Sequence, residues 1–331
     1  MESQAVAAIR AEGLKKTYPG GVKALDGLSF AVAPGTVYAL LGPNGAGKST
    51  AVKVLTTLTQ ADAGEAVVAG LDVRRRGAEV RRMIGCVAQK SGVDANATGR
   101  ENLRLQGRFY GMRGVELERR IDELLARFRL AEFADKISRT FSGGMQRKLD
   151  IAMGLIHRPA VLFLDEPTTG LDPEARSSLW NEISWLAGES GITILLTTHY
   201  LEEADKLAGR VGIVDRGRLV AEGTPEGLKS ELQGDAVQVE FGEPQKEAAV
   251  RAALERVAGI GEIVVESQAV HARAQHGASA APAILSALDQ AGLRAMAVRI
   301  ARPSLDDVYL HYTGRSFQEA DAQLPMAGGK R

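Results

Sequence analysis

A glycine-rich loop constrains the fold of this chain more than any other stretch of its sequence. The pattern G-x-x-x-x-G-K-[ST] is matched by Gly42, Pro43, Asn44, Gly45, Ala46, Gly47, Lys48, Ser49 and Thr50. Glycines in such a loop let successive backbone N–H groups point at phosphate oxygens without obstruction by a Cβ atom. An apolar stretch, residues 37–41, precedes the loop, and a helical pattern over residues 50–58 follows it. The sequence therefore predicts a strand, a phosphate-binding loop and a helix whose positive end faces the bound anion.

Two side chains of this loop suit a nucleotide. Lys48 is expected on the β- and γ-phosphates, and the Ser49 hydroxyl is expected to ligate Mg²⁺. The alternative is a glycine-rich turn without a ligand, which we disfavour because the flanking strand and helix are both present. We therefore predict nucleotide binding, whereas the kind of nucleotide-binding protein has to come from other motifs.

Two adjacent acids follow a second apolar stretch. Residues 161–164 read Val-Leu-Phe-Leu, and Asp165 and Glu166 come directly after them. Acids at the carboxyl end of a buried strand lie where open α/β sheets bind their ligands. Asp165 can hold Mg²⁺ through water, and Glu166 can accept a proton from an attacking water, which are roles that phosphoryl transfer requires. The alternative, two solvated acids at a strand end, is disfavoured beside a phosphate-binding loop.

Short apolar stretches alternate with helical patterns through the first two-thirds of the chain. This alternation predicts an α/β fold with a largely parallel sheet. Lys plus Arg and Asp plus Glu number 41 each, so the formal charge is zero and no nucleic-acid partner is expected. No apolar stretch approaches the ~20 residues of a membrane span, and residues 1–10 lack the layout of a signal peptide. We therefore expect a soluble, cytoplasmic protein.

A serine followed by two glycines marks the start of another helix. Ser142 is a favourable N-cap, and apolar residues follow it at helical spacing from Met145 to Ile156. The segment Ser142-Gly143-Gly144-Met145-Gln146 resembles the signature sequence of ABC ATPases, LSGGQ in its commonest form, with Phe141 and Met145 as departures. The resemblance implies a P-loop ABC-type nucleotide-binding domain with a helical signature subdomain. It also implies that this helix end contacts the γ-phosphate of an ATP molecule bound by a second subunit.

Four further residues fall in the order typical of the same family. Tyr18 stands where the family stacks an aromatic ring on adenine, and Gln89 resembles the glutamine that reaches Mg²⁺ and the attacking water. Asp172, between Leu171 and Pro173, resembles the aspartate of the loop at the dimer seam, and His199 resembles the switch histidine that contacts the γ-phosphate. Read alone, Tyr18 would be a half-buried strand residue and His199 a structural one. Their order along the chain favours the family roles, with Glu166, His199 and Gln89 as the catalytic set.

The sequence pattern changes near residue 234. Strand and helix patterns then follow in the order βαββαβ, which is typical of a ferredoxin-like α+β module. We assign residues 1–232 to the ATPase domain, 233–315 to an accessory module and 316–331 to a disordered polar tail. The module and its closing segment resemble the tail of the ATPases of bacterial ABC-2-type exporters of the daunorubicin-resistance type. A generic dimerisation or stability module is the alternative.

Together these resemblances imply an ATP-binding and ATP-hydrolysing motor subunit of an ABC exporter. Two copies are expected to form a homodimer around two ATP molecules with Mg²⁺ and to drive a separate integral membrane permease of ABC-2 type. The chain would then be peripheral on the inner face of the cell membrane, and the expected cargo is a hydrophobic small molecule or antibiotic. The alternative is a soluble ABC ATPase acting on DNA or ribosomes. Such proteins usually carry coiled-coil insertions, zinc cysteines or two ATPase domains, features that this sequence does not suggest.

Overall fold

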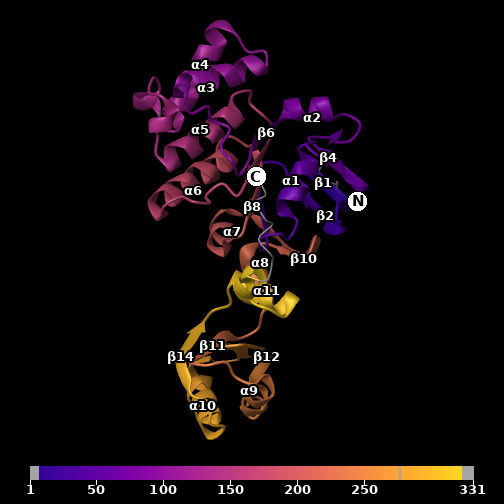
Figure 1. The fold of residues 1–331 in the computed structure, drawn as a ribbon, viewed down its shortest axis with the longest axis vertical. Helices are drawn as coiled ribbons and strands as arrows, with labels where there is room; N and C mark the ends of the chain where they lie inside the picture. Colours follow the sequence, from indigo (N-terminus) through magenta and orange to yellow (C-terminus); the bar gives the residue numbers. More distant parts are fainter. Residues whose placement is uncertain (1–6, 276, 323–331) are drawn as a thin grey trace. The chain divides into compact units, whose positions relative to one another are not determined.

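The computed structural model describes residues 7–275 and 277–322. Contacts divide the chain into two compact units, the first ending at Glu222 and the second beginning at Gly223 (Figure 1). Each unit has its own hydrophobic core, so each can be understood from its own residues.

A six-stranded sheet forms the centre of the first unit. Its strand order is β10-β9-β3-β8-β7-β6, and its strands are β3 Val37–Leu41, β6 Ile84–Val87, β7 Val161–Asp165, β8 Thr193–Thr198, β9 Arg210–Asp215 and β10 Arg218–Gly223. The pairs β3–β8, β3–β9, β6–β7 and β7–β8 are parallel, as the alternation of strand and helix patterns predicts. The carboxyl ends of β3, β8 and β7 therefore meet at one edge of the sheet, and the segments that carry the predicted site follow directly from them.

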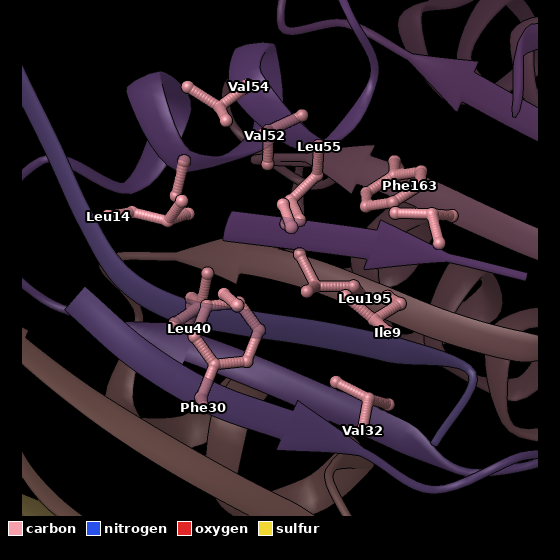
Figure 2. Close-up of a cluster of buried hydrophobic side chains, with 14 of the residues drawn as sticks. Ile9, Leu14, Phe30, Val32, Leu40, Val52, Val54, Leu55, Phe163 and Leu195 are labelled. Carbon is pink, nitrogen blue, oxygen red and sulfur yellow. The ribbon is translucent and has the colours of Figure 1, made fainter. Parts of the chain in front are cut away.

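A smaller sheet shares a hydrophobic cluster with the central one. It is antiparallel between neighbouring strands in the order β2-β1-β4-β5, with β1 Ile9–Tyr18, β2 Val22–Val32, β4 Ala63–Val68 and β5 Leu71–Asp72. Figure 2 shows this cluster, to which Leu55 of helix α1 (Lys48–Leu55) belongs together with Phe163 and Leu195 of the central sheet. Each such side chain, once fully buried, contributes roughly 1.5–3 kcal/mol. The cluster thus fixes α1 against β3 and holds the loop that joins them.

A group of helices separates β6 from β7 along the chain and corresponds to the predicted signature subdomain. It comprises α3 Gly99–Phe109, α4 Gly114–Arg127, the 3₁₀ turns Ala131–Phe133 and Ser138–Thr140, and α5 Gly143–Leu155. A capping box starts α3, because Thr98 Oγ1 accepts a hydrogen bond from Glu101 N and Glu101 Oε2 accepts one from Thr98 N. The other helices of the unit are α2 Gly77–Met83, α6 Pro173–Gly188 and α7 Leu201–Leu207. No helix in the described part of the chain is long and apolar enough to cross a membrane.

The second unit has the ferredoxin-like topology that its sequence pattern predicts. Its antiparallel sheet has the order β12-β13-β11-β14, and its elements are α8 Pro225–Glu231, β11 Asp235–Phe241, α9 Glu247–Leu254, β12 Ile260–Glu266, β13 Ala269–Ala274, α10 Gly277–Gln290, β14 Ala295–Ala301, α11 Leu305–Thr313 and α12 Phe317–Ala322. Helices α9 and α10 lie side by side against the sheet (Figure 1). Val239, Leu254 and Leu288 are buried in the core that they enclose.

The division between the units lies before the boundary that we placed at residue 232. Helix α8 was assigned to the ATPase domain, but contacts group it with the second unit. It packs against α11, and Tyr312 Oη donates a hydrogen bond to Glu231 Oε2 at 3.1 Å. A short helix whose partner lies far along the chain cannot be assigned from local patterns alone.

The segment expected to be disordered from residue 316 is partly helical. Helix α12 begins at Phe317, whose buried ring meets that of Tyr309 edge-on at a centroid distance of 5.0 Å. Ser316 N donates to Glu266 Oε1 and Phe317 N donates to Asp306 Oδ1, so side chains of the module fix this backbone. The polar composition of residues 316–331 predicted disorder, but the segment contains one aromatic side chain, Phe317, that is buried. The remainder of the predicted tail, residues 323–331, lies outside the described residues.

Candidate active site

The predicted phosphate-binding loop joins β3 to α1, as expected. Gly47 has φ of 108°, and a Cβ atom at this position would approach Ala24 O to 2.3 Å. Gly42 is equally confined, because its Cβ would lie 2.3 Å from Val214 O. Both positions therefore require glycine. Asn44 and Gly45 are exposed at the tip of the loop, Pro43 and Ala46 are buried beneath it, and Ser49 and Thr50 are half-buried at the start of the helix.

Lys48 lies beneath the loop and is only 4% exposed. Its ammonium donates hydrogen bonds to Gly42 O at 2.6 Å and to Pro43 O at 3.0 Å. The same nitrogen lies 3.7 Å from Glu166 Oε1. A buried cation is thus held on the loop backbone, with an acid as its counter-charge.

A hydroxyl from the first turn of α1 and a carboxylate at the end of β7 meet. Ser49 Oγ donates a hydrogen bond to Asp165 Oδ1 at 3.1 Å, and Thr197 Oγ1 donates to the same oxygen at 2.6 Å. Hydroxyl and carboxylate oxygens are ligands of the type that Mg²⁺ prefers. The donor set therefore fits a small divalent cation.

Glu166 is the centre of the cluster and is 7% exposed. Its Oε2 accepts hydrogen bonds from Gln89 Nε2 at 3.1 Å and Thr169 Oγ1 at 3.3 Å. Its Oε1 lies 3.4 Å from His199 Nδ1 and 3.7 Å from Lys48 Nζ. Burial raises the pKa of Glu166, but His199 and the charge of Lys48 lower it by more, so this pKa lies below its ordinary value. The carboxyl is therefore ionised at neutral pH and able to accept a proton.

The signature residues gather on a different surface from this cluster. Ser142 caps α5 by accepting a hydrogen bond from Met145 N, and Asp172 caps α6 by accepting one from Ala175 N. Gly144 is packed so closely on α6 that a Cβ there would lie 2.9 Å from Ala175 Cβ. Ser142, Gly143 and Asp172 are exposed. The starts of α5 and α6 thus form one face that is open to solvent in a single copy.

Tyr18 ends β1 and is half-exposed, with Lys16 Nζ 5.8 Å from the ring centroid. A ring held at a strand end with an accessible face can stack on a planar group.

Two contributors to the site escaped the sequence analysis. Thr197 holds both acids, because its hydroxyl bonds Asp165 and its backbone oxygen accepts from Glu166 N at 3.1 Å. Arg147 donates to backbone oxygens around the same turn. No local pattern distinguishes Arg147 from a surface cation of an amphipathic helix, and its burial is seen only in the structure.

Comparison with known proteins identifies the family. Residues 25–169 match the family described as "ABC transporter", and residues 223–313 match "ATP-binding protein DrrA1-3-like, C-terminal domain". The chain is 45% identical over 317 residues to "Daunorubicin resistance ATP-binding protein DrrA2" of Streptomyces coeruleorubidus, covering 96% of this chain and 98% of that protein. This chain belongs to the ABC transporter ATP-binding proteins.

Other similar proteins support the same family assignment. "Nod factor export ATP-binding protein I" of Paraburkholderia xenovorans is 39% identical, covering 95% of this chain and 99% of that protein. Among solved structures, a dimeric post-hydrolysis state of the ATP-binding cassette MJ0796 bound to ADP and Pi has a TM-score of 0.60 and 26% identity, covering 65% of this chain and 98% of that one.

The predictions of an α/β ABC-type fold, of ATP binding and hydrolysis, and of an ABC exporter ATPase are confirmed. Related ATP-binding cassettes have been solved as dimers. The alternative of an ABC ATPase acting on DNA or ribosomes finds no support among these relatives.

Proposed function

We propose that two copies of this ABC ATPase enclose two ATP molecules with Mg²⁺ and drive an ABC-2-type permease that exports a hydrophobic small molecule or antibiotic. The convergence of Lys48, Gln89 and His199 on the Glu166 carboxylate carries the catalytic part of this proposal. Each of these side chains comes from a different segment, and all of them are aimed at one acid.

In the proposed site, residues 42–50 bind the phosphates and Tyr18 stacks on the adenine. Lys48 supplies the positive charge for the β- and γ-phosphates. Ser49 and Asp165 hold Mg²⁺ with Gln89 beside them, and the 3.1 Å contact between Ser49 Oγ and Asp165 Oδ1 supports this donor set. The cation, when bound, neutralises charge on the phosphate oxygens.

Glu166 is the proposed general base. Its lowered pKa keeps the carboxylate ready to take a proton from the attacking water. Gln89 contacts one carboxylate oxygen and His199 approaches the other, so the two side chains limit how the acid can rotate. His199 is also the proposed contact to the γ-phosphate, which would link proton removal to the presence of that phosphate.

The second copy is proposed to complete each site with Ser142, Gly143 and Gly144, next to Asp172 at the seam. Two observations support this arrangement. The N-terminus of α5 is exposed and carries the positive end of a 13-residue helix, which favours an anion. Related ABC cassettes have been solved as dimers.

Docking of the permease is proposed on the helical subdomain. Phe109 is 76% exposed and Val115 is 86% exposed, at the end of α3 and the start of α4, and Leu105 of α3 is 52% exposed. Large apolar side chains so exposed are typical of an interaction surface. The proposed surface lies in the sequence between Gln89 and α5. A force that the permease exerts on this surface can therefore move both the catalytic glutamine and the signature residues.

The names of similar proteins support the proposed cargo. These names include daunorubicin resistance, linearmycin resistance and Nod factor export. We infer a hydrophobic small molecule as cargo and a peripheral position on the inner face of the membrane. We also propose that the ATPase domain ends near Glu222 and that the second unit is an accessory module.

Transport into inverted membrane vesicles tests this function. Vesicles containing the chain and its proposed permease should accumulate daunorubicin when ATP is added. Vesicles with Glu166→Gln should not, although they contain the same amount of both proteins. Uptake that is equal with and without ATP, for daunorubicin and for linearmycin alike, would contradict the proposed export.

A further inference from the structure

The proposed general base has an unusual backbone. Glu166 has φ of 47°, in the left-handed region that non-glycine residues rarely adopt. Such a conformation persists only where the surroundings hold it, and it aims a side chain that the extended strand could not. Glu166 N is held by Thr197, donating to its backbone oxygen and its hydroxyl at 3.1 Å each. The carbonyl side of the turn needs a separate partner.

Arg147 supplies that partner. Its guanidinium donates from Nη2 to Asp165 O at 3.0 Å and to Glu166 O at 3.3 Å, and from Nε to Pro167 O at 2.8 Å. Three successive carbonyl oxygens of the catalytic turn thus converge on one side chain. Arg147 is only 7% exposed, so water does not substitute for these contacts.

The same side chain also reaches the segment that carries Gln89. Arg147 Nη1 donates to Ala88 O at 2.6 Å, directly before Gln89. One turn further along α5, Asp150 Oδ1 accepts from Gly92 N at 2.9 Å. The two buried side chains lie 4.0 Å apart as an ion pair and therefore bracket Gln89 from both sides.

We propose that Arg147 is a positioning residue that links the signature helix to Glu166 and Gln89 of its own chain. A planar guanidinium with five N–H donors suits this task, because it can serve four carbonyls at once, whereas an ammonium is a single point with three donors. Burial lowers the pKa of Arg147 and Asp150 compensates its charge, which agrees with a side chain kept inside for its contacts.

The position of Arg147 gives this link a direction. Helix α5 begins after Ser142, and Arg147 follows five residues later, or ~7.5 Å along the helix axis. Because the stretch from Ser142 to Arg147 is short and helical, a tilt or shift of the first turn of α5 moves Ser142 and Arg147 together. Contact at Ser142, which the proposed function assigns to the partner's nucleotide, would therefore be felt at the catalytic turn of the same chain.

The first test compares steady-state ATPase kinetics of Arg147→Lys, Arg147→Met and the control Lys148→Met. Lys148 is the next residue on α5, and its ammonium contacts only Ser178 Oγ among the described side chains, on α6. We expect kcat to fall ~10-fold for lysine and ~100-fold for methionine, with KM for ATP within about threefold of wild type. The lysine variant keeps the charge balance with Asp150 and should therefore fold if the methionine variant does not. Values of kcat within twofold of wild type for a folded Arg147 variant would overturn the proposal.

A double-mutant cycle with Glu166→Gln separates positioning from general stability. If Arg147 acts through Glu166, most of its effect should vanish once the base is gone, so that Arg147→Lys lowers the residual rate of Glu166→Gln less than threefold. Multiplication of the two defects would show that Arg147 acts independently of the base and would overturn the proposal. This cycle uses identical chains and needs no shared site.

Mixed dimers test whether Arg147 acts on the catalytic turn of its own chain, a test that rests on the proposed function. Arg147→Met is mixed in turn with Ser142→Arg and with Lys48→Ala. An effect within the chain predicts a gain of activity with Ser142→Arg, because one site then combines an intact catalytic turn with an intact Ser142. It predicts no gain with Lys48→Ala. The opposite pattern would overturn the link, whereas failure of Lys48→Ala and Ser142→Arg to complement each other would count against the shared site alone.

Discussion

Replacing Glu166 by glutamine should separate ATP binding from ATP hydrolysis. Glutamine keeps the shape of the side chain and an oxygen that can accept from Gln89 Nε2, but it cannot take a proton. Loss of a general base costs ~10²–10⁴-fold in rate, which corresponds to ~3–5 kcal/mol of activation free energy. We therefore expect kcat to fall by this factor.

The structure also predicts the direction of the change in ATP affinity. Glu166 Oε1 lies 3.7 Å from Lys48 Nζ. Two unit charges at about this distance interact by roughly 4 kcal/mol at an effective dielectric constant near 20. Neutralising the acid removes an attraction that competes with the phosphates for Lys48. If a third of this interaction energy is recovered as free energy of ATP binding, ATP should bind about tenfold more tightly.

The assay combines single-turnover hydrolysis with calorimetric titration of ATP, and sizing should show an ATP-bound dimer for the variant. Glu189→Gln provides the control, since Glu189 is exposed at the end of α6. Hydrolysis within threefold of wild type would refute the assignment of the base and make His199 the first alternative. Weakened ATP binding with normal folding would refute the electrostatic argument.

Three further predictions concern binding, domain organisation and pH. Lys48→Ala should lose most ATP affinity by calorimetry while keeping its thermal midpoint within a few degrees, and binding at wild-type affinity would contradict the loop assignment. Truncation after Glu222 should leave ATP binding measurable, because every proposed nucleotide contact lies before it, and an insoluble product would contradict the division. The neighbouring His271 imidazole, with Nε2 3.7 Å from Glu266 Oε2, lowers the pKa of Glu266 to about 2, whereas burial lowers the pKa of His271 but Glu266 raises it by more. The contribution of Glu266 is therefore lost as pH falls from about 4.5 toward 2, and that of His271 is lost as pH rises through its raised pKa. The second unit should unfold at a lower temperature at pH 8.5 than at pH 6, and a His271→Gln variant that keeps the full difference would contradict this.

Local patterns predicted the parts of the site that lie next to each other in sequence. The loop 42–50 and the pair Asp165–Glu166 combine a buried strand with chemistry at its end, so a short window contains the whole signal. Their meeting follows from the parallel order of β3, β8 and β7. The positions of Gln89 and His199 beside Glu166 agree with the family resemblance, although their spacing alone could not give it.

The remaining features depend on contacts between distant segments. Arg147 looks like a surface cation of an amphipathic helix until the carbonyls of residues 88 and 165–167 are placed around it. Helix α8 pairs with α11, far along the chain. Phe317, in the segment predicted to be a disordered tail, packs on Tyr309. In each case the sequence contains the interacting groups, but the pairing is decided by tertiary packing.

The central claim, that each ATP site is shared between two copies, is tested most directly by mixing two inactive variants. Lys48→Ala lacks a working loop and Ser142→Arg lacks a working signature, so a heterodimer contains one site with both defects and one with neither. Free exchange of subunits would make about a quarter of all sites whole, and ATPase activity should reappear on mixing. Mixing Lys48→Ala with Glu166→Gln is the matched control, since both defects lie on the same side of the site and no whole site can form. Recovery with Ser142→Arg but not with Glu166→Gln is the predicted result. No recovery, with heterodimers verified by a tagged pull-down and with wild type/Lys48→Ala heterodimers active, would contradict the shared site.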